Sequence, residues 1–205
     1  MTRESKRIPS PERRRQILSV AAELFARQGF HGTTTRQIAE RVGVKETILF
    51  RLFPSKEELY WAVIDLKCQA RPGRKLLESQ LAAESNERKM FAAIATGILQ
   101  RNMQDATLTR LLMFSGLEAH ELSERFFQTY IAGYYETLAN YIRRRIREGT
   151  FRKVDPLLAA RAFLGMVFNH FLVQELFGAE RYQKFDIETV SETLADIWLK
   201  GMEQR

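Results

Sequence analysis

The sequence predicts an all-α fold, and three observations lead to this prediction. Apolar residues recur at three- and four-residue spacings through most of the 205 positions. No stretch shows sustained two-residue alternation between turn signals, so no sheet is expected. Hydrophobic residues make up 45% of the chain and charged residues 28%, which is enough apolar material for a sizeable core.

The first quarter of the chain is predicted to form a short arm followed by a compact group of helices. Residues 1–10 show no apolar period and are expected to be a flexible basic arm. Pro11 then opens a helix, since a proline in the first turn loses no hydrogen bond, and Gly29 ends it. Two short helices follow, at about 35–42 and 45–53.

A fourth helix begins after Ser55, which is a suitable N-cap, with Glu57 and Glu58 in the first turn, where the helix dipole favours acids. The break at Pro72-Gly73 interrupts or ends this helix. Beyond it, further helices are predicted at about 74–84, 87–103, 105–115, 120–148, 156–178 and 187–203.

The net positive charge of the chain comes from its first quarter. Residues 1–56 hold 12 Lys/Arg against 5 Asp/Glu, whereas residues 57–205 hold 20 of each. A basic patch on one small unit indicates a polyanionic partner, with nucleic acid favoured over an anionic membrane surface. The alternative is a solvated basic tail.

Several classes of protein are disfavoured. Cys68 is the single cysteine and cannot form an internal disulfide, and the longest charge-free apolar stretch, 162–174, is too short to span a membrane. We therefore expect a cytoplasmic, nucleoid-associated protein with no membrane partner. No metal-ligand spacing, phosphate loop or nucleophile signature is present, so no metal, cofactor or catalytic residue is predicted. An all-α enzyme built from dispersed residues stays open as the less favoured alternative.

Residues 33–53 have the spacing of a helix-turn-helix. Ile38 and Val42 can pack two short helices together, Ala39 permits their close approach, and Gly43 suits the turn between them. Leu49 would bury the inner face of the second helix, leaving its outer face free for a DNA major groove. An ordinary αα-hairpin shares this pattern, but the local positive charge favours DNA binding.

The sequence here resembles the TetR-type family of bacterial transcriptional regulators. The resemblance covers about 50 residues from the first helix onward and rests on Gly29-Phe30, Thr34-Thr35-Arg36, Ile38-Ala39, Val42-Gly43-Val44, Leu49, Phe53 and Ser55-Lys56-Glu57-Glu58-Leu59. It implies a helix-turn-helix domain at 11–56 and a helical ligand-binding and dimerisation domain at 57–205. It also implies a repressor or activator that binds a palindromic DNA operator as a homodimer and whose DNA affinity a small molecule in the C-terminal domain changes. Of the two we expect a repressor, and the excess of aromatic side chains in that domain predicts that the molecule releasing it is a small apolar or aromatic effector. The alternative is a DNA-binding protein that responds to a protein partner or to no ligand.

The resemblance also assigns DNA contacts. The residues expected at the DNA are Thr34, Thr35, Arg36, Lys45, Glu46, Thr47, Phe50, Arg51 and Lys56. Among them, Arg36 can donate a bidentate pair to guanine, and Lys56 corresponds to the family's phosphate contact. The chain departs from the family pattern at Ile48, Phe50 and Leu52, where the family often has threonine, tyrosine and histidine. Polar contact then depends more on Thr35, Arg36, Arg51 and Lys56.

Large apolar residues dominate the remainder of the chain. An effector site is predicted at Phe91, Phe114, Phe127, Tyr130, Tyr134, Phe163 and His170. Any single aromatic residue at helical spacing can instead be core, and His120, Asn169 and His170 can instead satisfy core hydrogen bonds. Segment 156–173 is apolar nearly all round, and by resemblance the last two helices form a dimer interface with Leu164, Phe168, Phe171, Leu194 and Trp198.

Overall fold

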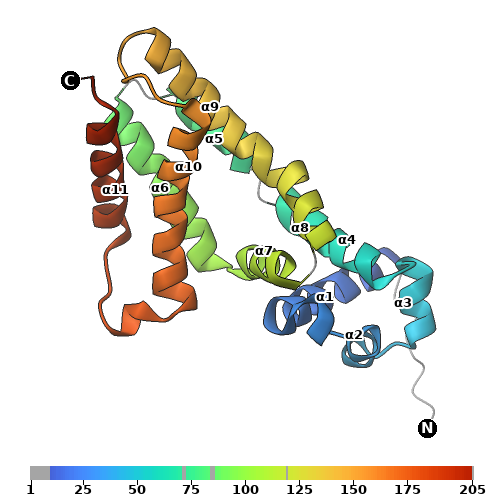
Figure 1. Ribbon diagram of the computed structural model, residues 1–205. Coiled ribbons are helices and arrows are strands. Elements are labelled where there is room, and N and C mark those ends of the chain that lie inside the picture. The colour runs from blue at the N-terminus through green and yellow to red at the C-terminus, as the bar shows by residue number, and fades with distance from the viewer. Residues whose placement is uncertain (1–9, 71–72, 84–85, 119, 205) are drawn as a thin grey trace. The chain divides into compact units, whose positions relative to one another are not determined.

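The structure is a computed structural model that describes residues 10–70, 73–83, 86–118 and 120–204. The predicted arm at 1–10 lies outside these residues except for Ser10, which begins the first helix. Within the described residues the chain is helical and has no strand, apart from an isolated antiparallel bridge between Phe151 and Glu203. The all-α prediction is confirmed (Figure 1).

The chain divides into two compact units, and it passes between them three times along the sequence. The N-terminal unit contains residues 1–71 and 107–126, and the C-terminal unit contains residues 72–106 and 127–205. The N-terminal unit therefore extends past the domain boundary expected at residue 56. It includes the fourth helix together with a segment from the middle of the chain.

The N-terminal unit is built from α1 (Ser10–Gly32), α2 (Thr35–Val42), α3 (Glu46–Leu52), α4 (Lys56–Gln69), α7 (Thr107–Glu118) and α8 (His120–Phe126). Helix α1 packs against α2, α4 and α7. Its centre is an aromatic cluster in which the Tyr60 ring meets those of Phe25 and Phe30 edge-on, at centroid distances of 4.9 and 5.3 Å. The fourth helix thus belongs to the same core as the first.

Gly29 interrupts α1 as the sequence predicts. Its φ of 76° and ψ of 179° are not helical, and one further helical turn follows up to Gly32. A positive φ costs little at glycine because it has no Cβ. The Thr33 hydroxyl then donates to the Gly29 carbonyl oxygen at 2.9 Å and fixes the junction with α2.

The C-terminal unit contains α5 (Gly73–Ala83), α6 (Glu87–Gln104), η1 (Phe127–Ile131), α9 (Ala132–Arg147), α10 (Pro156–Phe171), η2 (Leu172–Leu176), η3 (Ala179–Arg181) and α11 (Ile187–Met202). The continuous helix predicted at 120–148 is instead divided by η1, a π-helical segment between α8 and α9. Such segments are rare in soluble proteins and are frequent at functional sites. The boundary between the two units falls at this segment.

Helix α10, continued by η2, is long and apolar enough to cross a membrane by length and composition alone, over Pro156–Leu176. Core helices of soluble proteins pass the same test. In this unit one face of α10 packs on α6, α9 and α11, with Phe163, Val167 and Phe171 buried. Leu158, Ala162 and other residues of a different face remain exposed.

Candidate nucleic-acid interface

Helix α2 starts from a complete capping box at Thr34 and Gln37. The Thr34 hydroxyl accepts from the Gln37 backbone N–H at 3.1 Å, and the Gln37 side-chain oxygen accepts from the Thr34 N–H at 2.9 Å. These two bonds satisfy N–H groups that a helix start otherwise leaves open. Thr34, predicted at the DNA, therefore has a structural role in holding the start of α2.

The turn between α2 and α3 depends on Gly43. Its φ of 75° and ψ of 38° lie in the left-handed region, and the Val44 N–H donates to the Ala39 carbonyl oxygen at 2.9 Å. Ile38 and Ala39 are buried below this turn. The geometry is that of a helix-turn-helix, with α3 as its second helix.

Helix α3 turns one side inward and presents the other to solvent. Leu49 is fully buried, whereas Lys45, Thr47, Phe50 and Arg51 are exposed. The Phe50 side chain is 43% exposed. An exposed apolar ring on this face suits contact with a thymine methyl group.

Two predicted DNA contacts already have partners inside the unit. The Thr35 hydroxyl donates to a Glu46 carboxylate oxygen at 2.5 Å and so links α2 to α3. Arg36 donates through Nε to Glu40 at 2.9 Å, and this hydrogen bond together with the Glu40 charge raises the pKa of Arg36. Both Thr35 and Arg36 would have to share or leave these partners when they contact DNA.

Lys56 lies at the first position of α4, directly after the Ser55 N-cap, whose hydroxyl accepts from the Glu58 N–H at 3.1 Å. Its ammonium is 4.3 Å from the centre of the Phe30 ring, a cation–π contact that restrains the side chain. Partial burial lowers the pKa of Lys56. The lysine is thereby positioned by α1 as well as by its own helix.

Arg36→Ala is expected to weaken operator binding by about 1–3 kcal/mol and to relax base preference at one position, because a bidentate contact to a base would be lost. Binding to operator variants in a fluorescence anisotropy titration measures both effects. Arg27→Ala is the matched control, since Arg27 is exposed and pairs with Glu23 in the same i,i+4 geometry, but on α1. Equal losses for all operator variants would show that Arg36 reads no base.

Lys56→Ala is expected to weaken binding to all sequences about equally and to lower the slope of log affinity against log salt by roughly one unit. The reason is that one phosphate contact releases about one counterion. Lys67→Ala, at the far end of the same helix, serves as the control. An unchanged salt slope for Lys56→Ala would remove this residue from the DNA interface.

The structure divides the predicted effector residues. Phe114 belongs to the N-terminal unit, and the others belong to the C-terminal unit. Phe91 and Phe163 are fully buried, with ring centroids 4.9 Å apart, and both pack on Trp198. In this structure both rings are therefore part of the core of the C-terminal unit, the alternative stated above for aromatic residues at helical spacing.

The remaining predicted effector residues are less enclosed. Tyr130 and Tyr134 are half-buried, and Phe127 is 44% exposed with its ring 6.3 Å from that of Tyr135. Phe127 and Tyr130 lie on the π-helical segment η1.

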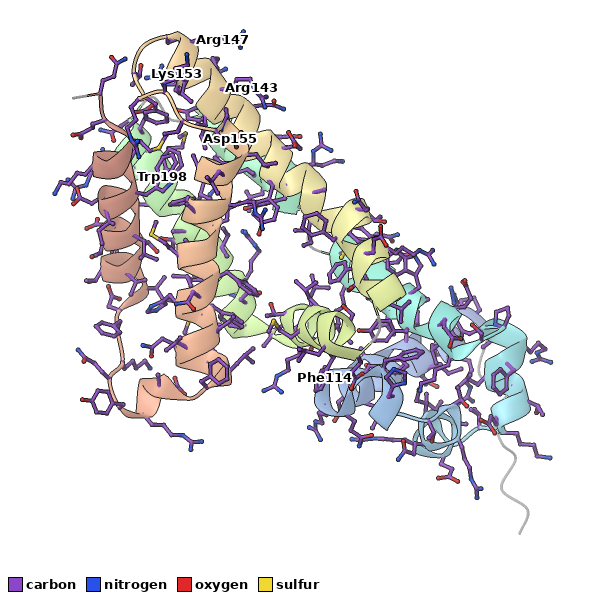
Figure 2. The ribbon with its side chains drawn as sticks, viewed as in Figure 1. Phe114, Arg143, Arg147, Lys153, Asp155 and Trp198 are labelled. Carbon is purple, nitrogen blue, oxygen red and sulfur yellow. The ribbon has the colours of Figure 1, made fainter. Side chains whose placement is uncertain are left out.

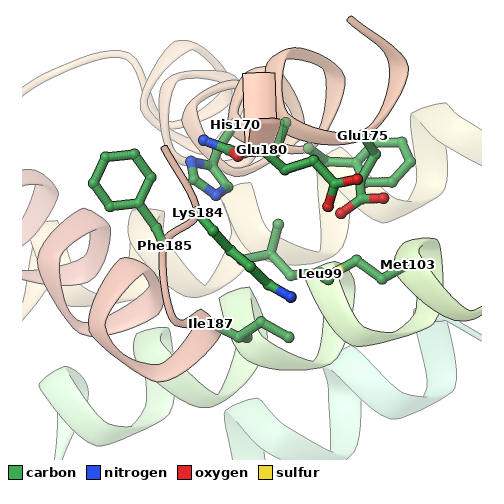
Figure 3. Close-up of a pocket in the computed structure, with 10 residues that line it drawn as sticks. Leu99, Met103, His170, Glu175, Glu180, Lys184, Phe185 and Ile187 are labelled. Atoms are coloured by element: carbon green, nitrogen blue, oxygen red, sulfur yellow. The ribbon is translucent and has the colours of Figure 1, made fainter. Parts of the chain in front are cut away.

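A small hollow lies elsewhere in the C-terminal unit, between α6, α10, the η2–η3 segment and the start of α11 (Figure 3). His170 is the one predicted effector residue in its wall, and burial lowers the pKa of this histidine. The hollow has a volume of about 20 Å³, which is room for about one water molecule. As it stands it is too small for an organic effector.

The predicted dimer residues are mostly interior. Leu164, Phe171 and Trp198 are buried, and Phe168 and Leu194 are half-buried. Trp198 lies among the side chains of its own unit (Figure 2) and donates through Nε1 to the Ala159 carbonyl oxygen at 3.1 Å. The buried three support the outer surface of α10 and α11 from within. That outer surface exposes Leu158, Ala162, Gly165 and Ile197.

Sequence reasoning missed Glu118, the last residue of α7. One of its carboxylate oxygens accepts from the backbone N–H groups of Phe30 and His31, at 2.6 and 3.2 Å. Phe30 and Glu118, which form the shorter bond, are 88 positions apart in the chain, so no local sequence pattern predicts this contact. The Gly29-Phe30 pair is visible in the sequence, but it identifies only the α1 side of the contact and not Glu118.

Comparison with known proteins agrees with this geometry. Residues 17–63 match the family described as bacterial regulatory proteins, tetR family. Residues 88–200, more than half of the chain, match the AefR-like transcriptional repressor, C-terminal domain. The first match contains the helix-turn-helix, and the second lies mainly in the C-terminal unit.

Three relatives illustrate the extent of the similarity. The HTH-type transcriptional regulator RutR of Escherichia coli is 42% identical over 83 residues, which cover 40% of this chain and 35% of RutR. The nucleoid occlusion factor SlmA of Haemophilus influenzae is 28% identical over 167 residues, covering 78% of this chain and 74% of SlmA. The transcriptional regulator FadR of Bacillus subtilis, solved in complex with stearoyl-CoA, is 19% identical with a TM-score of 0.70, covering 92% of this chain and 99% of FadR. With two family matches over the two parts of the fold, the chain belongs to the TetR family of bacterial DNA-binding transcriptional regulators.

Proposed function

We propose that this regulator is a repressor that binds a palindromic operator as a homodimer and leaves it when an apolar small molecule binds the C-terminal unit. The observation that carries the DNA-binding part is the helix-turn-helix of α2 and α3, whose exposed face lies in the first quarter of the chain, where 12 Lys/Arg stand against 5 Asp/Glu. Such a protein acts in the cytoplasm, at the nucleoid. Repression is supported by the match of residues 88–200 to a repressor family.

Dimerisation is supported by the exposed apolar face of the last two long helices. Leu158 on α10 is 67% exposed and Ile197 on α11 is 56% exposed. A second copy that covers this face would remove both side chains from water and add hydrophobic stabilisation. The dimer would also set the spacing of two α3 helices, which must be about 34–36 Å to enter successive major grooves.

An apolar effector is supported by the aromatic residues around η1 and by one solved relative. Phe127, Tyr130 and Tyr134 are grouped in sequence on η1 and the start of α9, where the regular helix is interrupted. FadR of Bacillus subtilis was solved with stearoyl-CoA, a ligand with a long acyl chain. The hollow described above lies away from η1 and holds about one water molecule, so an effector that entered there would have to displace side chains.

The test begins with selection of bound sequences from a random DNA pool, followed by titration of the selected operator with and without stearoyl-CoA. The proposal expects a palindromic site and a lower operator affinity when stearoyl-CoA is bound. Linkage also requires saturating operator to weaken stearoyl-CoA binding by the same factor. A selected site without two-fold symmetry would contradict operator binding by a dimer, and unchanged operator affinity at saturating stearoyl-CoA would contradict an acyl effector.

A second candidate is a DNA binder that needs no small effector. It is favoured by the similarity to SlmA, named as a nucleoid occlusion factor, over 78% of this chain. The same titration separates the two functions. Tight operator binding that neither stearoyl-CoA nor a library of apolar metabolites alters would support this second candidate.

A further inference from the structure

We infer that Glu118 is a positioning residue for DNA binding. Its carboxylate holds the junction between α1 and α2, and through Phe30 it holds the ammonium of Lys56 where a DNA phosphate is met. The inference rests on the proposed role of Lys56 as a phosphate contact. It adds a residue of α7, in the middle of the chain, to the determinants of DNA affinity.

The first step is the contact between Glu118 and the end of α1. Directly after Gly29 leaves helical geometry, the N–H groups of Phe30 and His31 both donate to Oε2 of Glu118, at 2.6 and 3.2 Å. His31 Nε2 also donates to the Glu118 carbonyl oxygen at 3.0 Å. Charge-assisted bonds of this kind are about twice as strong as neutral ones, and here two converge on one oxygen.

The second step is the space that Gly29 leaves open. A Cβ at this position would lie 2.1 Å from Oε1 of Glu118 and 2.6 Å from its carboxyl carbon. No side chain fits there while the carboxylate stays in place. The glycine is thus required twice, for its φ of 76° and for the close approach of Glu118.

The third step leads from Phe30 to Lys56. The Phe30 backbone nitrogen is bound by Glu118, and the Phe30 ring lies 4.3 Å from the Lys56 ammonium. A shift of the junction therefore moves the ring that restrains the lysine. The same ring packs edge-on against Tyr60 of α4, so the start and the second turn of this helix both rest on Phe30.

Helix α7 is also fastened to α4. The Tyr60 hydroxyl, buried in the unit, donates to the Leu111 carbonyl oxygen at 2.8 Å. Burial and the Glu118 charge both raise the pKa of Tyr60, so this hydroxyl keeps its proton and its donor role at neutral pH. Within the N-terminal unit, α7 therefore contacts both the junction after Gly29 and the helix that carries Lys56.

The test compares Glu118→Ala with Glu124→Ala in the full-length chain. Both variants remove one carboxylate from the N-terminal unit, but Glu124 is an exposed residue of α8. The comparison cancels the general gain in DNA affinity that the loss of a negative charge brings. Gly29→Ala is a second perturbation that displaces the carboxylate without changing the charge. Because it also strains the backbone at a φ of 76°, its effect is interpreted only beside that of Glu118→Ala. Operator affinity, its salt slope and the melting temperature are measured for each, with amide spectra by NMR.

We expect Glu118→Ala and Gly29→Ala to bind operator on the order of tenfold more weakly than Glu124→Ala, with the salt slope lowered by about one unit. The Phe30 and His31 amide protons should move upfield in Glu118→Ala as their carboxylate acceptor is lost. In the Lys56→Ala background, Glu118→Ala should cost nothing further relative to Glu124→Ala. If Glu118→Ala does not fold, Glu118→Gln, which keeps one acceptor oxygen, carries the same measurements with a smaller expected loss.

A purely structural role gives a different result: a lower melting temperature, with operator affinity and salt slope equal to those of Glu124→Ala. That result, or additive losses in the double variant, would overturn the inference. Measurements on the wild-type chain distinguish failure of this inference from failure of the proposed function. Absence of operator binding by the wild type contradicts the proposed function, whereas wild-type binding that Glu118→Ala leaves unchanged contradicts the role of Glu118.

Discussion

Trp198→Ala is expected to lower the free energy of unfolding by about 3–5 kcal/mol, the usual cost of removing a large buried aromatic side chain. The Trp198 ring lies 4.5 Å from that of Phe91, 5.6 Å from Phe163 and 5.7 Å from Phe151, measured between centroids. Its truncation leaves a cavity among these rings and deprives the Ala159 carbonyl oxygen of the indole donor. Since a domain is stable by only about 5–15 kcal/mol, this loss is a large fraction of the free energy of unfolding.

Urea titration followed by circular dichroism, at one fixed protein concentration, measures this loss, since the stability of a dimer depends on concentration. Tyr182→Ala is the control because Tyr182 is also aromatic but is 94% exposed. We expect it to change the unfolding free energy by less than about 0.5 kcal/mol. Equal effects of the two substitutions would mean that Trp198 is not a core residue in solution.

Ile197→Asp is expected to split the proposed dimer and to weaken operator binding on the order of 10²–10⁴-fold, because each monomer would then hold only one half-site. The expected cause is a charge buried without a partner in the interface. Since Ile197 is 56% exposed in the single chain, the monomer itself should fold normally. This separates Ile197 from Trp198, whose replacement disrupts the unit from within.

Sedimentation at micromolar concentration measures the oligomeric state, and circular dichroism checks the fold. Gln100→Asp adds the same charge to an exposed position of α6 in the same unit and should leave both unchanged. A wild-type chain that sediments as a monomer would contradict the dimer. A dimeric Ile197→Asp would move the interface away from α11.

The helices could be predicted from the sequence because their signals are local. Ser55 caps α4, Gly43 ends α2 and Gly29 breaks α1, each through its own backbone conformation or hydroxyl group. The interruption at η1 was not predicted, since a π-helical segment keeps an apolar pattern compatible with a regular helix. The extension of the N-terminal unit to 107–126 was also missed, because it depends on packing between distant segments.

The position of the candidate DNA surface could be predicted from the sequence, but the hydrogen bonds and ion pairs among its side chains could not. The i,i+4 spacing of Arg36 and Glu40 was readable, yet spacing alone does not say whether an exposed pair forms. The bond from Thr35 to Glu46 requires the angle between α2 and α3, which only the folded turn supplies. In the C-terminal unit, helical spacing could not tell a core ring such as Phe91 from a ring that faces a ligand.

The placement of residues 107–126 in the N-terminal unit affects how the DNA-binding unit of this regulator could be exchanged for that of another protein. A chimera joined after residue 71 would combine a foreign α1 with the native α7, so that Glu118 would face whatever residue replaced Gly29. Any residue larger than glycine there would collide with the carboxylate. Recombination that transfers a new operator preference would therefore keep the Glu118 contact only if both segments are transferred, or if the donor has a glycine at the position of Gly29.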